Sequence, residues 1–326
     1  MMKKRILSGM RPTGKLHLGN YVGALENWVK LQGEYENFHL VADWHLLTTN
    51  LDTSHLKQDT LDMVMDWLAA GIDPVESPIF VQSHIKQHAE LFLILSMLVT
   101  VPRLERNPTV KEQAKALGVD TNMVFGHLGY PVLQAADIIL YKAHLVPVGE
   151  DQLPHVELTR EVARKFNSTY DDVFIVPRGQ VTEFSRLPGL DGNKMSKSLG
   201  NTILLSDSPE DIGKKVMRAI TDPEKIRKGD PGRPEVCNVY TYHRKFNPEE
   251  VPDVSRDCKS GVLGCVDCKK NLARKISEYF AKFRDKREYY ETHVDEVEEI
   301  IANGDKIAGE VAEQTMKEVY DAMHIG

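Results

Sequence analysis

Residues 5–25 read RILSGMRPTGKLHLGNYVGAL, a short apolar run followed by a glycine-containing turn and then by helical spacing. This arrangement predicts a phosphate or nucleotide site. Gly14 and Gly19 allow the backbone to approach a ligand closely, and a helix starting at Asn20 would offer free N–H groups. His17 can donate a hydrogen bond to a phosphate oxygen. A plain strand-to-helix connection explains the turn equally well, because neither GxGxxG nor a P-loop is present.

Short apolar runs alternate with longer helical patterns along the first 160 residues. This alternation favours a mostly parallel sheet with helices on both faces, in which ligands bind beyond the carboxyl ends of the strands. The expected strands are 5–9, 38–44, 79–82 and 145–149, and the expected helices are 20–32, 54–70 with Ser54 as N-cap, 88–98 and 130–141.

After about residue 205 the strand signals disappear, and helical patterns cover 209–217, 262–287 and 294–323. We therefore expect two domains. Residues 1–205 form an α/β domain with a doubly wound, Rossmann-like parallel sheet. Residues 206–326 form a helical domain, whose last helix packs back on the first domain.

Composition restricts the class of protein. Hydrophobic residues make up 41% and charged residues 27% of the 326 residues, as in ordinary globular proteins. No apolar run reaches the roughly 18 residues of a membrane span, so we expect a cytoplasmic protein without a membrane partner. The net charge of -7 argues against a dedicated nucleic-acid binder. However, residues 256–287 hold ten Lys and Arg against four Asp and Glu. This stretch either attracts phosphates or forms a solvated helical face.

A second polar cluster, DGNKMSKSLGN, occupies residues 191–201. It places two lysines three residues apart, with a serine between them and glycines on both sides. Such a cationic loop can close over a polyphosphate. Phosphoryl and nucleotidyl transfer depend on positioning and charge neutralisation more than on a covalent nucleophile. Taken alone, an ordinary surface loop would explain the lysines better.

Together the two clusters resemble the signatures of class I aminoacyl-tRNA synthetases. Residues 17–20, HLGN, are similar to the HIGH motif with Asn in the last place, and residues 194–198 match KMSKS. The resemblance implies that His17, Asn20, Lys194 and Lys197 are catalytic and stabilise charge on the phosphates of ATP, which Mg²⁺ bridges. The further ATP contacts that it implies are Arg11, Gly14, Gly19, Met195, Ser196 and Ser198.

The segments GNYVGALENW, VADWHLLTT, YPVLQAADIILYK and VPVGEDQLPHVELTREVARKFN are similar to tryptophanyl-tRNA synthetases. Asp137 lies in an otherwise apolar helix, where a carboxylate is costly unless it meets a donor, and the indole N–H of tryptophan is such a donor. The resemblance gives Asp137 that role and places Gly149, Asp151 and Gln152 at the activated nucleotide. The other tryptophan contacts that it implies are Leu7, His45, Tyr130, Gln134, Val146 and Val148, with Gln152 shared.

The resemblance also implies partners. It predicts a homodimer formed through a helical insertion near residues 100–145, and tRNA(Trp) bound through its anticodon by the helical domain. Leu7, Arg11, Thr109 and Gln134 depart from the residues typical of the commonest bacterial tryptophan enzymes.

Three alternative functions stay open. A tyrosyl-tRNA synthetase also uses a Gln and an Asp on this helix, a nucleotidylyltransferase has a HIGH-like turn, and a metal-bearing RNA-binding module needs no catalysis.

All four cysteines lie within 32 residues, with the spacing C-x20-C-x6-C-x2-C. Structural disulfides are rare in cytoplasmic enzymes, so a metal site is the better explanation. Zinc sites usually show the two-residue gap twice, whereas this chain has it once, so a 4Fe–4S cluster competes with Zn²⁺ and with unligated thiols. Some bacterial tryptophanyl-tRNA synthetases carry a 4Fe–4S cluster on a similar pattern. The expected ligands of a non-catalytic 4Fe–4S cluster are Cys237, Cys258, Cys265 and Cys268.

Overall fold

The computed structural model describes residues 3–181 and 187–325, which divide into two compact units. The sheet unit comprises Met1–Gly14, Glu26–Glu183 and His293–Gly326, and the helical unit comprises Lys15–Leu25 and Phe184–Thr292. Among the described residues, no helix is both long and apolar enough to cross a membrane.

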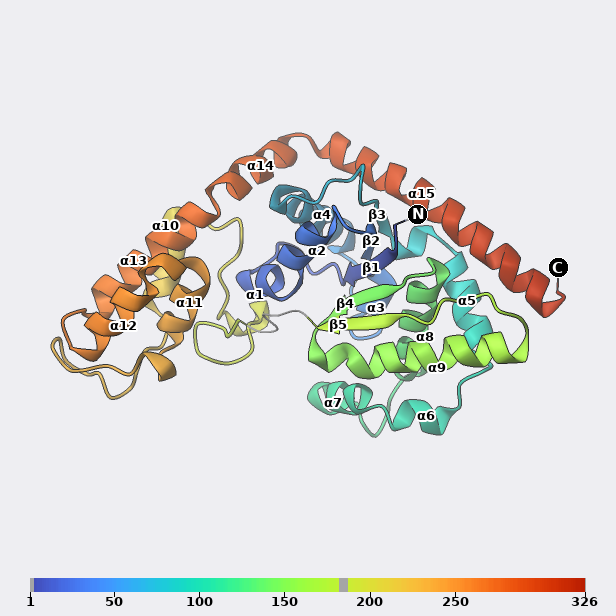
Figure 1. The fold of residues 1–326 in the computed structure, drawn as a ribbon, viewed down its shortest axis with the longest axis horizontal. Coiled ribbons are helices and arrows are strands. Elements are labelled where there is room, and N and C mark those ends of the chain that lie inside the picture. The colour runs from blue at the N-terminus through green and yellow to red at the C-terminus, as the bar shows by residue number, and fades with distance from the viewer. Residues whose placement is uncertain (1–2, 182–186, 326) are drawn as a thin grey trace. The chain divides into compact units, whose positions relative to one another are not determined.

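A parallel sheet forms the centre of the sheet unit (Figure 1). In the described residues the strand order is β3-β2-β1-β4-β5. β2 and β3 are added on one side of β1, and β4 and β5 on the other, so the strand order reverses between β1 and β4. This confirms the predicted fold class. Because the strands are parallel, the polar residues that follow them gather beyond one edge of the sheet. The strands are β1 (Arg5–Met10), β2 (Glu36–Val41), β3 (Ile79–Val81), β4 (Leu145–Val148) and β5 (Arg178–Val181).

Helices cover both faces of this sheet. Phe38 and Leu40 of β2 belong to a core that includes side chains of α5, α8, α9 and α15. On the other face, His39 of β2 stacks on Trp28 of α2, and Trp67 of α4 packs against both rings. The helices of this unit are α2 (Glu26–Leu31), α3 (Asp43–Leu47), α4 (Leu56–Ala70), α5 (Gln87–Ser96), α6 (Val101–Glu105), α7 (Pro108–Leu117), α8 (Phe125–Leu140), α9 (Leu153–Thr169) and α15 (Val294–Met323), with a 3₁₀ turn at Gln82–His84.

The last helix, α15, packs along the edge strand β3 (Figure 1). The two elements approach closely because residue 304 is glycine, since a Cβ there would collide with the carbonyl oxygen of Ile79. Asp305 then accepts a hydrogen bond of 2.9 Å from the backbone N–H of Val81. The edge of the sheet is therefore covered by a helix that also supplies a hydrogen-bond acceptor.

The helical unit is built from short helices around aromatic and aliphatic side chains. Phe280 lies at its centre, with ring centroids of Tyr21, Phe246 and Tyr279 at 5.0, 5.9 and 4.9 Å. A π-helical turn at Tyr21–Leu25 continues its first helix. The helices are α1 (Leu18–Asn20), α10 (Pro209–Met217), α11 (Asn238–Phe246), α12 (Val251–Lys259), α13 (Cys265–Tyr279) and α14 (Ala281–Thr292).

The helix expected at 130–141 begins earlier, at Phe125. Three further expected boundaries are wrong for local reasons. The strand expected to reach residue 44 ends at Val41, because Asp43 begins α3 and accepts the N–H of Trp44. Ser54 is not an N-cap, since its own N–H donates to Asp52 and α4 begins at Leu56. The helix expected at 262–287 begins only at residue 265 and is interrupted at residue 280. The sequence patterns also do not predict β5, α9, α11 or α12, which are polar or short.

Candidate functional site

His17 caps the helix that follows it. The Nδ1 atom of His17 accepts the backbone N–H of Asn20 at 3.3 Å, and the side-chain oxygen of Asn20 accepts the backbone N–H of His17 at 3.1 Å. The helix therefore begins at Leu18, and the N–H of Asn20, expected to be free for an anion, is already used. With Nδ1 as the acceptor, a neutral His17 carries its proton on Nε2, where it can donate to a phosphate.

The surroundings of His17 keep it neutral. Burial disfavours the imidazolium, and the positive charge of Lys197 adds to this, so that the pKa of His17 falls to about 4 from an ordinary value of 6.5. At neutral pH the ring is therefore an uncharged donor, and the lysines supply the positive charge.

This charge state is testable by NMR titration of the His17 ring in the ligand-free protein. We expect a midpoint near pH 4 with the proton on Nε2 above it, and an upward shift in Lys197→Ala, which removes the nearby like charge. Lys214→Ala, which alters an exposed lysine on α10 paired with Glu210, serves as control and should leave the midpoint in place. A midpoint near 6.5 in the unaltered protein would contradict the proposed environment.

The second cluster, residues 191–201, forms a well-ordered loop with exposed lysines, called the lysine loop below. Lys194 and Lys197 are exposed, whereas Met195 between them is buried. The hydroxyl oxygens of Ser196 and Ser198 lie 2.9 Å apart. A one-turn 3₁₀ helix at Lys197–Leu199 ends in Gly200, whose φ of 64° favours glycine. The loop thus fixes its backbone while it presents two ammonium groups.

Asn201 organises this loop, a role that the sequence does not predict. Its side-chain oxygen accepts the N–H of Ser196 at 2.8 Å, and its amide nitrogen donates to Asp191 at 2.8 Å and to the carbonyl of Lys194 at 3.1 Å. Asn201 is 4% exposed, and Gly189 leaves room for its amide. The only sequence signal is the position of Asn201 at the end of the motif.

The two clusters meet inside the helical unit. The N–H of Leu18 donates to the carbonyl of Ile203 at 2.9 Å, directly after the lysine loop. The N–H of Gly19 points at the sulfur of Met195 at 3.2 Å, and a Cβ on Gly19 would crowd both that sulfur and the ring of His17. The structure therefore brings His17, Gly19 and Asn20 next to the lysine loop. The imidazole of His17 is a hydrogen-bond donor, and Lys194 and Lys197 are positively charged.

In the sheet unit, Asp137 is the centre of a buried network. It is 3% exposed and accepts from His45 Nε2 at 2.8 Å and from His88 Nδ1 at 2.7 Å. The amide of Gln82 reaches both carboxylate oxygens, at 2.8 and 2.9 Å. The hydroxyl of Tyr141 lies 2.8 Å from His88 Nε2. The sequence predicts His45 here but not Gln82, His88 or Tyr141, because their positions carry no motif.

These contacts keep Asp137 ionised. Burial alone would raise the pKa of this carboxyl, but the hydrogen bonds and charges of His45 and His88 outweigh burial and hold the pKa well below its usual range. A neutral His88 fits the network, with Nδ1–H donating to Asp137 and Nε2 accepting from Tyr141. Asp137 already accepts one hydrogen bond each from His45 and His88 and two from Gln82. A donor from a ligand would therefore add to these hydrogen bonds or replace one of them.

Tyr130, two turns before Asp137 on α8, is oriented by a second chain of hydrogen bonds. Its hydroxyl lies 3.0 Å from His155 Nε2, and the amide of Asn107 donates to His155 Nδ1 at 3.2 Å. Burial lowers the pKa of His155 to about 4, so that this ring is neutral. His155 Nε2–H then donates to the Tyr130 oxygen, and the hydroxyl proton of Tyr130 is available to a ligand.

The remaining predicted residues of the sheet unit lie on the sheet and around its carboxyl edge. Leu7 and Val146 are buried in the core beneath that edge, and Val148 is half-buried. Gln134 is half-buried, and no hydrogen bond to its side chain is found in the described part of the chain. Gly149 follows β4 and leads into a turn in which Gln152 donates to Asp151 at 3.1 Å, and Arg11 after β1 donates to Thr49 at 3.2 Å.

The four cysteines are half-buried free thiols in the helical unit. Burial, together with the charges of the other three cysteines, raises the pKa of Cys268 to about 12, so the sulfurs lie within each other's field. Cys268 Sγ lies 3.3 Å from His243 Nε2, and glycine at 232 allows the preceding loop to pass against Cys258. Within residues 3–181 and 187–325, no group of three or more His, Cys, Asp or Glu side chains is arranged so that it could hold a metal ion.

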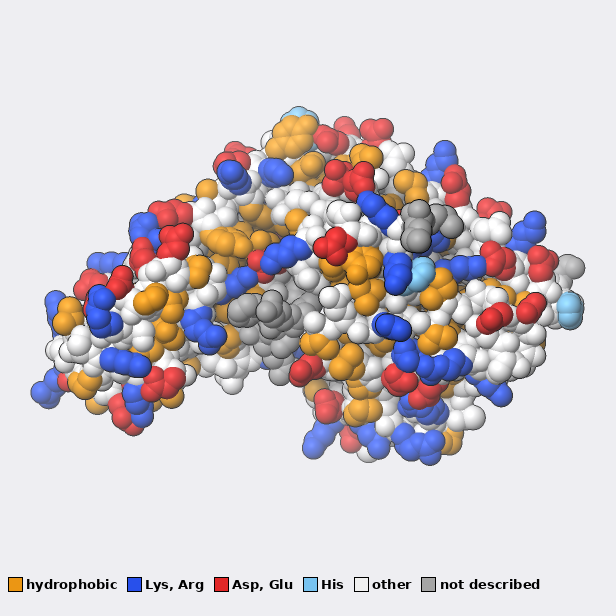
Figure 2. Space-filling model, in the orientation of Figure 1, with side chains coloured by type: hydrophobic (Ala, Val, Ile, Leu, Met, Phe, Trp, Pro, Cys, Tyr) orange, Lys and Arg blue, Asp and Glu red, His pale blue; other side chains and the backbone are white. Residues whose placement is uncertain are grey.

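The basic stretch 256–287 is partly neutralised. Arg256 pairs with Asp253, and Arg274 and Lys275 reach Glu250 at 4.0 and 2.7 Å. Figure 2 shows Lys and Arg side chains of the helical unit interspersed with Asp and Glu rather than gathered in one patch. Lys259 and Lys270 are exposed, and no ion pair to them is found in the described part of the chain.

Comparison with known proteins agrees with the resemblance of the two signature clusters to class I synthetases. Residues 2–281 match the family model of class I tRNA synthetases for tryptophan and tyrosine (W and Y). A tryptophan–tRNA ligase of Thermotoga maritima is 52% identical, covering 98% of this chain and 99% of its own, and one of Aquifex aeolicus is 42% identical over 98% and 100%. Among solved structures, a tryptophanyl-tRNA synthetase of Campylobacter jejuni complexed with ADP and tryptophan is 32% identical. It has a TM-score of 0.88 and coverage of 98% of this chain and 100% of its own.

Proposed function

Because the chain belongs to the class I tRNA synthetases for tryptophan and tyrosine, we propose how its residues divide the work of a tryptophan–tRNA ligase. The activity itself rests on one observation, the 52% identity to a tryptophan–tRNA ligase over 98% of the chain. As such a ligase, the chain activates tryptophan with ATP and transfers it to tRNA(Trp). A tyrosine specificity is not supported by these relatives.

In the proposed first step, a carboxylate oxygen of tryptophan attacks the α-phosphorus of ATP, and the bond to pyrophosphate breaks. No covalent enzyme intermediate forms. His17 donates from Nε2 to a phosphate oxygen, and Lys194 and Lys197 neutralise the charge that builds up on the leaving pyrophosphate. Mg²⁺ enters bound to ATP and leaves with pyrophosphate. In the second step a ribose hydroxyl at the end of the tRNA attacks the carbonyl carbon, and AMP leaves.

The sheet unit recognises the amino acid in this proposal. Asp137 accepts the indole N–H. His45 also hydrogen-bonds to the carboxylate of Asp137 and holds it in place. Tyr130 and Gln134 supply polar groups that the described chain leaves available, while Leu7, Val146 and Val148 form apolar contacts. Arg11, Gly14, Gly149, Asp151 and Gln152 contact the nucleotide part of the activated product.

ATP–pyrophosphate exchange with each of the twenty amino acids tests this function. We expect exchange with tryptophan to exceed that with tyrosine or phenylalanine by about 10⁴-fold or more, because a site built around a hydrogen bond rejects ligands that lack the group. Preferential exchange with tyrosine would instead identify the other specificity of the family. Absence of exchange with any amino acid would overturn catalysis itself and leave an RNA-binding role.

We further propose that residues 206–326 bind the anticodon arm of tRNA(Trp) and that two chains form a homodimer in the cytoplasm. Exposed lysines such as Lys259 and Lys270 are suited to phosphates. The proposed dimer surface is the helical insertion near 100–145 together with the preceding helix α5, where large apolar side chains stay exposed. These are Leu93, Met97, Val101, Leu117, Val124 and Phe125.

We also propose that Cys237, Cys258, Cys265 and Cys268 hold a 4Fe–4S cluster, with Zn²⁺ as the alternative. Burial and the neighbouring thiols raise the pKa of Cys258 and of Cys268, so a cationic centre that takes them as thiolates would relieve the cost of their ionisation. A four-iron cluster spreads its thiolates more widely than one zinc ion does, and glycines at 229, 232 and 261 let the surrounding loops close. The cluster would shape the tRNA-binding surface and take no part in the chemistry.

The cluster is testable on anaerobically purified protein. We expect a brown protein with about four irons per chain. Cys265→Ser should lose the colour and reduce aminoacylation of tRNA while it spares adenylate formation, and Ser260→Ala is the control. Colourless protein with one zinc per chain would favour the alternative, and loss of adenylate formation in a folded Cys265→Ser variant would refute the non-catalytic role.

A further inference from the structure

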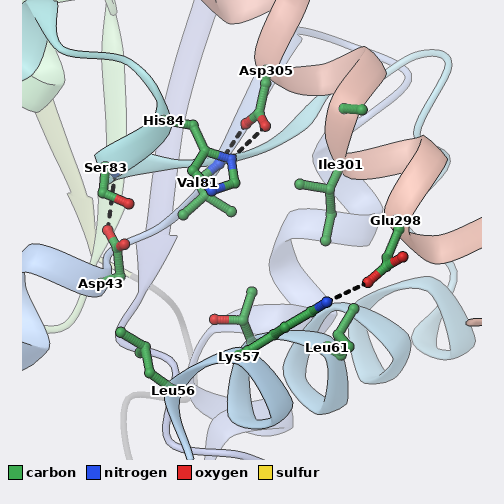
Figure 3. Close-up of a pocket in the computed structure, with 12 residues that line it drawn as sticks. Asp43, Leu56, Lys57, Leu61, Val81, Ser83, His84, Glu298, Ile301 and Asp305 are labelled. Atoms are coloured by element: carbon green, nitrogen blue, oxygen red, sulfur yellow. Dashed lines mark hydrogen bonds and ion pairs between the residues drawn. The ribbon is translucent and has the colours of Figure 1, made fainter. Parts of the chain in front are cut away.

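A second pocket lies in the sheet unit (Figure 3), lined by Val81 and Ser83, the chain neighbours of Gln82. Its volume is about 480 Å³, within the usual range for small-molecule sites. The start of α4, the end of β3 with the turn that follows, and the first half of α15 enclose it. Apolar side chains form much of its wall, namely Leu56, Leu61, Val81, Ile301 and Ala302.

Asp43 is the buried polar group of this pocket. It is 6% exposed, and one of its oxygens accepts the N–H groups of Trp44 at 2.9 Å and of Ser83 at 3.0 Å. Figure 3 shows the contact between this carboxylate and Ser83 at the wall of the pocket. Within the described chain no donor reaches its second oxygen. Asp43 lines the pocket, so a protonated donor bound there can reach this carboxylate.

The other charged groups of the pocket already have partners. Asp305 accepts from the N–H of Val81 and from His84 Nδ1, at 2.9 and 2.6 Å. Lys57 pairs with Glu298 at 2.9 Å. Three carboxylates therefore face one lysine and one histidine, which makes the pocket attractive to cations.

From these observations we propose that this pocket is a second ligand site, which binds a small organic cation with an apolar ring. The protonated amine donates to the free oxygen of Asp43, and the ring packs against Leu61, Val81 and Ile301. Asp43 lies two residues before His45 on α3, so the proposed ligand and tryptophan are bound by the same helix, each at its own site.

The probe for this site is 4-(trifluoromethyl)benzylamine, followed by ¹⁹F NMR on the full chain with saturating L-tryptophan. The neutral comparison ligand is 4-(trifluoromethyl)benzyl alcohol. We expect the amine to bind about 10-fold or more tighter than the alcohol, as one charge-assisted hydrogen bond implies. Asp43→Asn should abolish this preference. Ala302→Phe, which fills the cavity, should abolish binding of both ligands.

The matched control is Glu313→Gln, in another acidic groove of the same unit, of about 640 Å³. It should retain the preference of the unaltered protein. The proposal is wrong if amine and alcohol bind equally to the unaltered protein, if neither binds, or if Asp43→Asn keeps the preference. Displacement of the amine by tryptophan would also overturn it, by placing the probe in the amino-acid pocket. If Asp43→Asn does not fold, retention of binding by Ala302→Phe overturns it instead.

Discussion

Replacing Lys194 or Lys197 with alanine is expected to slow formation of tryptophanyl-adenylate by about 100- to 1,000-fold, equivalent to about 2.7 to 4 kcal/mol of barrier. Both side chains are exposed, while the loop below them is held by Asn201 and by the buried Met195. Each substitution should therefore remove a charge without moving the loop. The neutral His17 beside them cannot replace the lost positive charge.

The measurement is a pre-steady-state burst of adenylate, compared with tryptophan binding by calorimetry. The dissociation constant of tryptophan should change little, because the lysines act on phosphates. Lys214→Ala, an exposed lysine on α10 that pairs with Glu210, controls for loss of charge in general. Wild-type adenylate rates in both loop variants would remove this loop from the chemistry.

Features whose residues are adjacent in the sequence are predictable from it. The two signature segments are each contiguous, so their resemblance to the class I motifs is enough to pair His17 with the lysine loop. The sheet follows from the apolar runs at β1 to β4. By contrast, all four residues of β5 are exposed, so no apolar pattern reveals this strand.

Features built from residues far apart in the sequence are not predictable in this way. The donors to Asp137 come from positions 92, 55 and 49 residues away, and only the fold brings them to one carboxylate. Physical reasoning does identify that a carboxylate in an apolar helix needs a donor. It does not reveal that the protein itself supplies three, or that Asn201 fixes the lysine loop.

Replacing Asp137 is expected to reduce the discrimination of tryptophan from phenylalanine. Asp137→Ala should raise the KM for tryptophan, but it also leaves His88 and Gln82 without their buried acceptor and so lowers stability. Asp137→Asn keeps an acceptor oxygen and removes the charge. We expect its ratio of kcat/KM values for the two amino acids to fall by about 10- to 150-fold, the worth of one hydrogen bond to a charged group.

A tryptophan analogue with sulfur in place of the indole N–H separates this contact from general damage to the network. The unaltered protein should lose activity on the analogue, whereas Asp137→Asn should treat the analogue and tryptophan nearly alike, because the lost bond is the same in both cases. Glu161→Gln, which removes an exposed carboxylate paired with Arg103, should behave like the unaltered protein. If the two losses are simply additive, Asp137 does not accept the indole N–H. Its role is then to hold His45 and His88 in place, and tryptophan must be recognised elsewhere in the pocket.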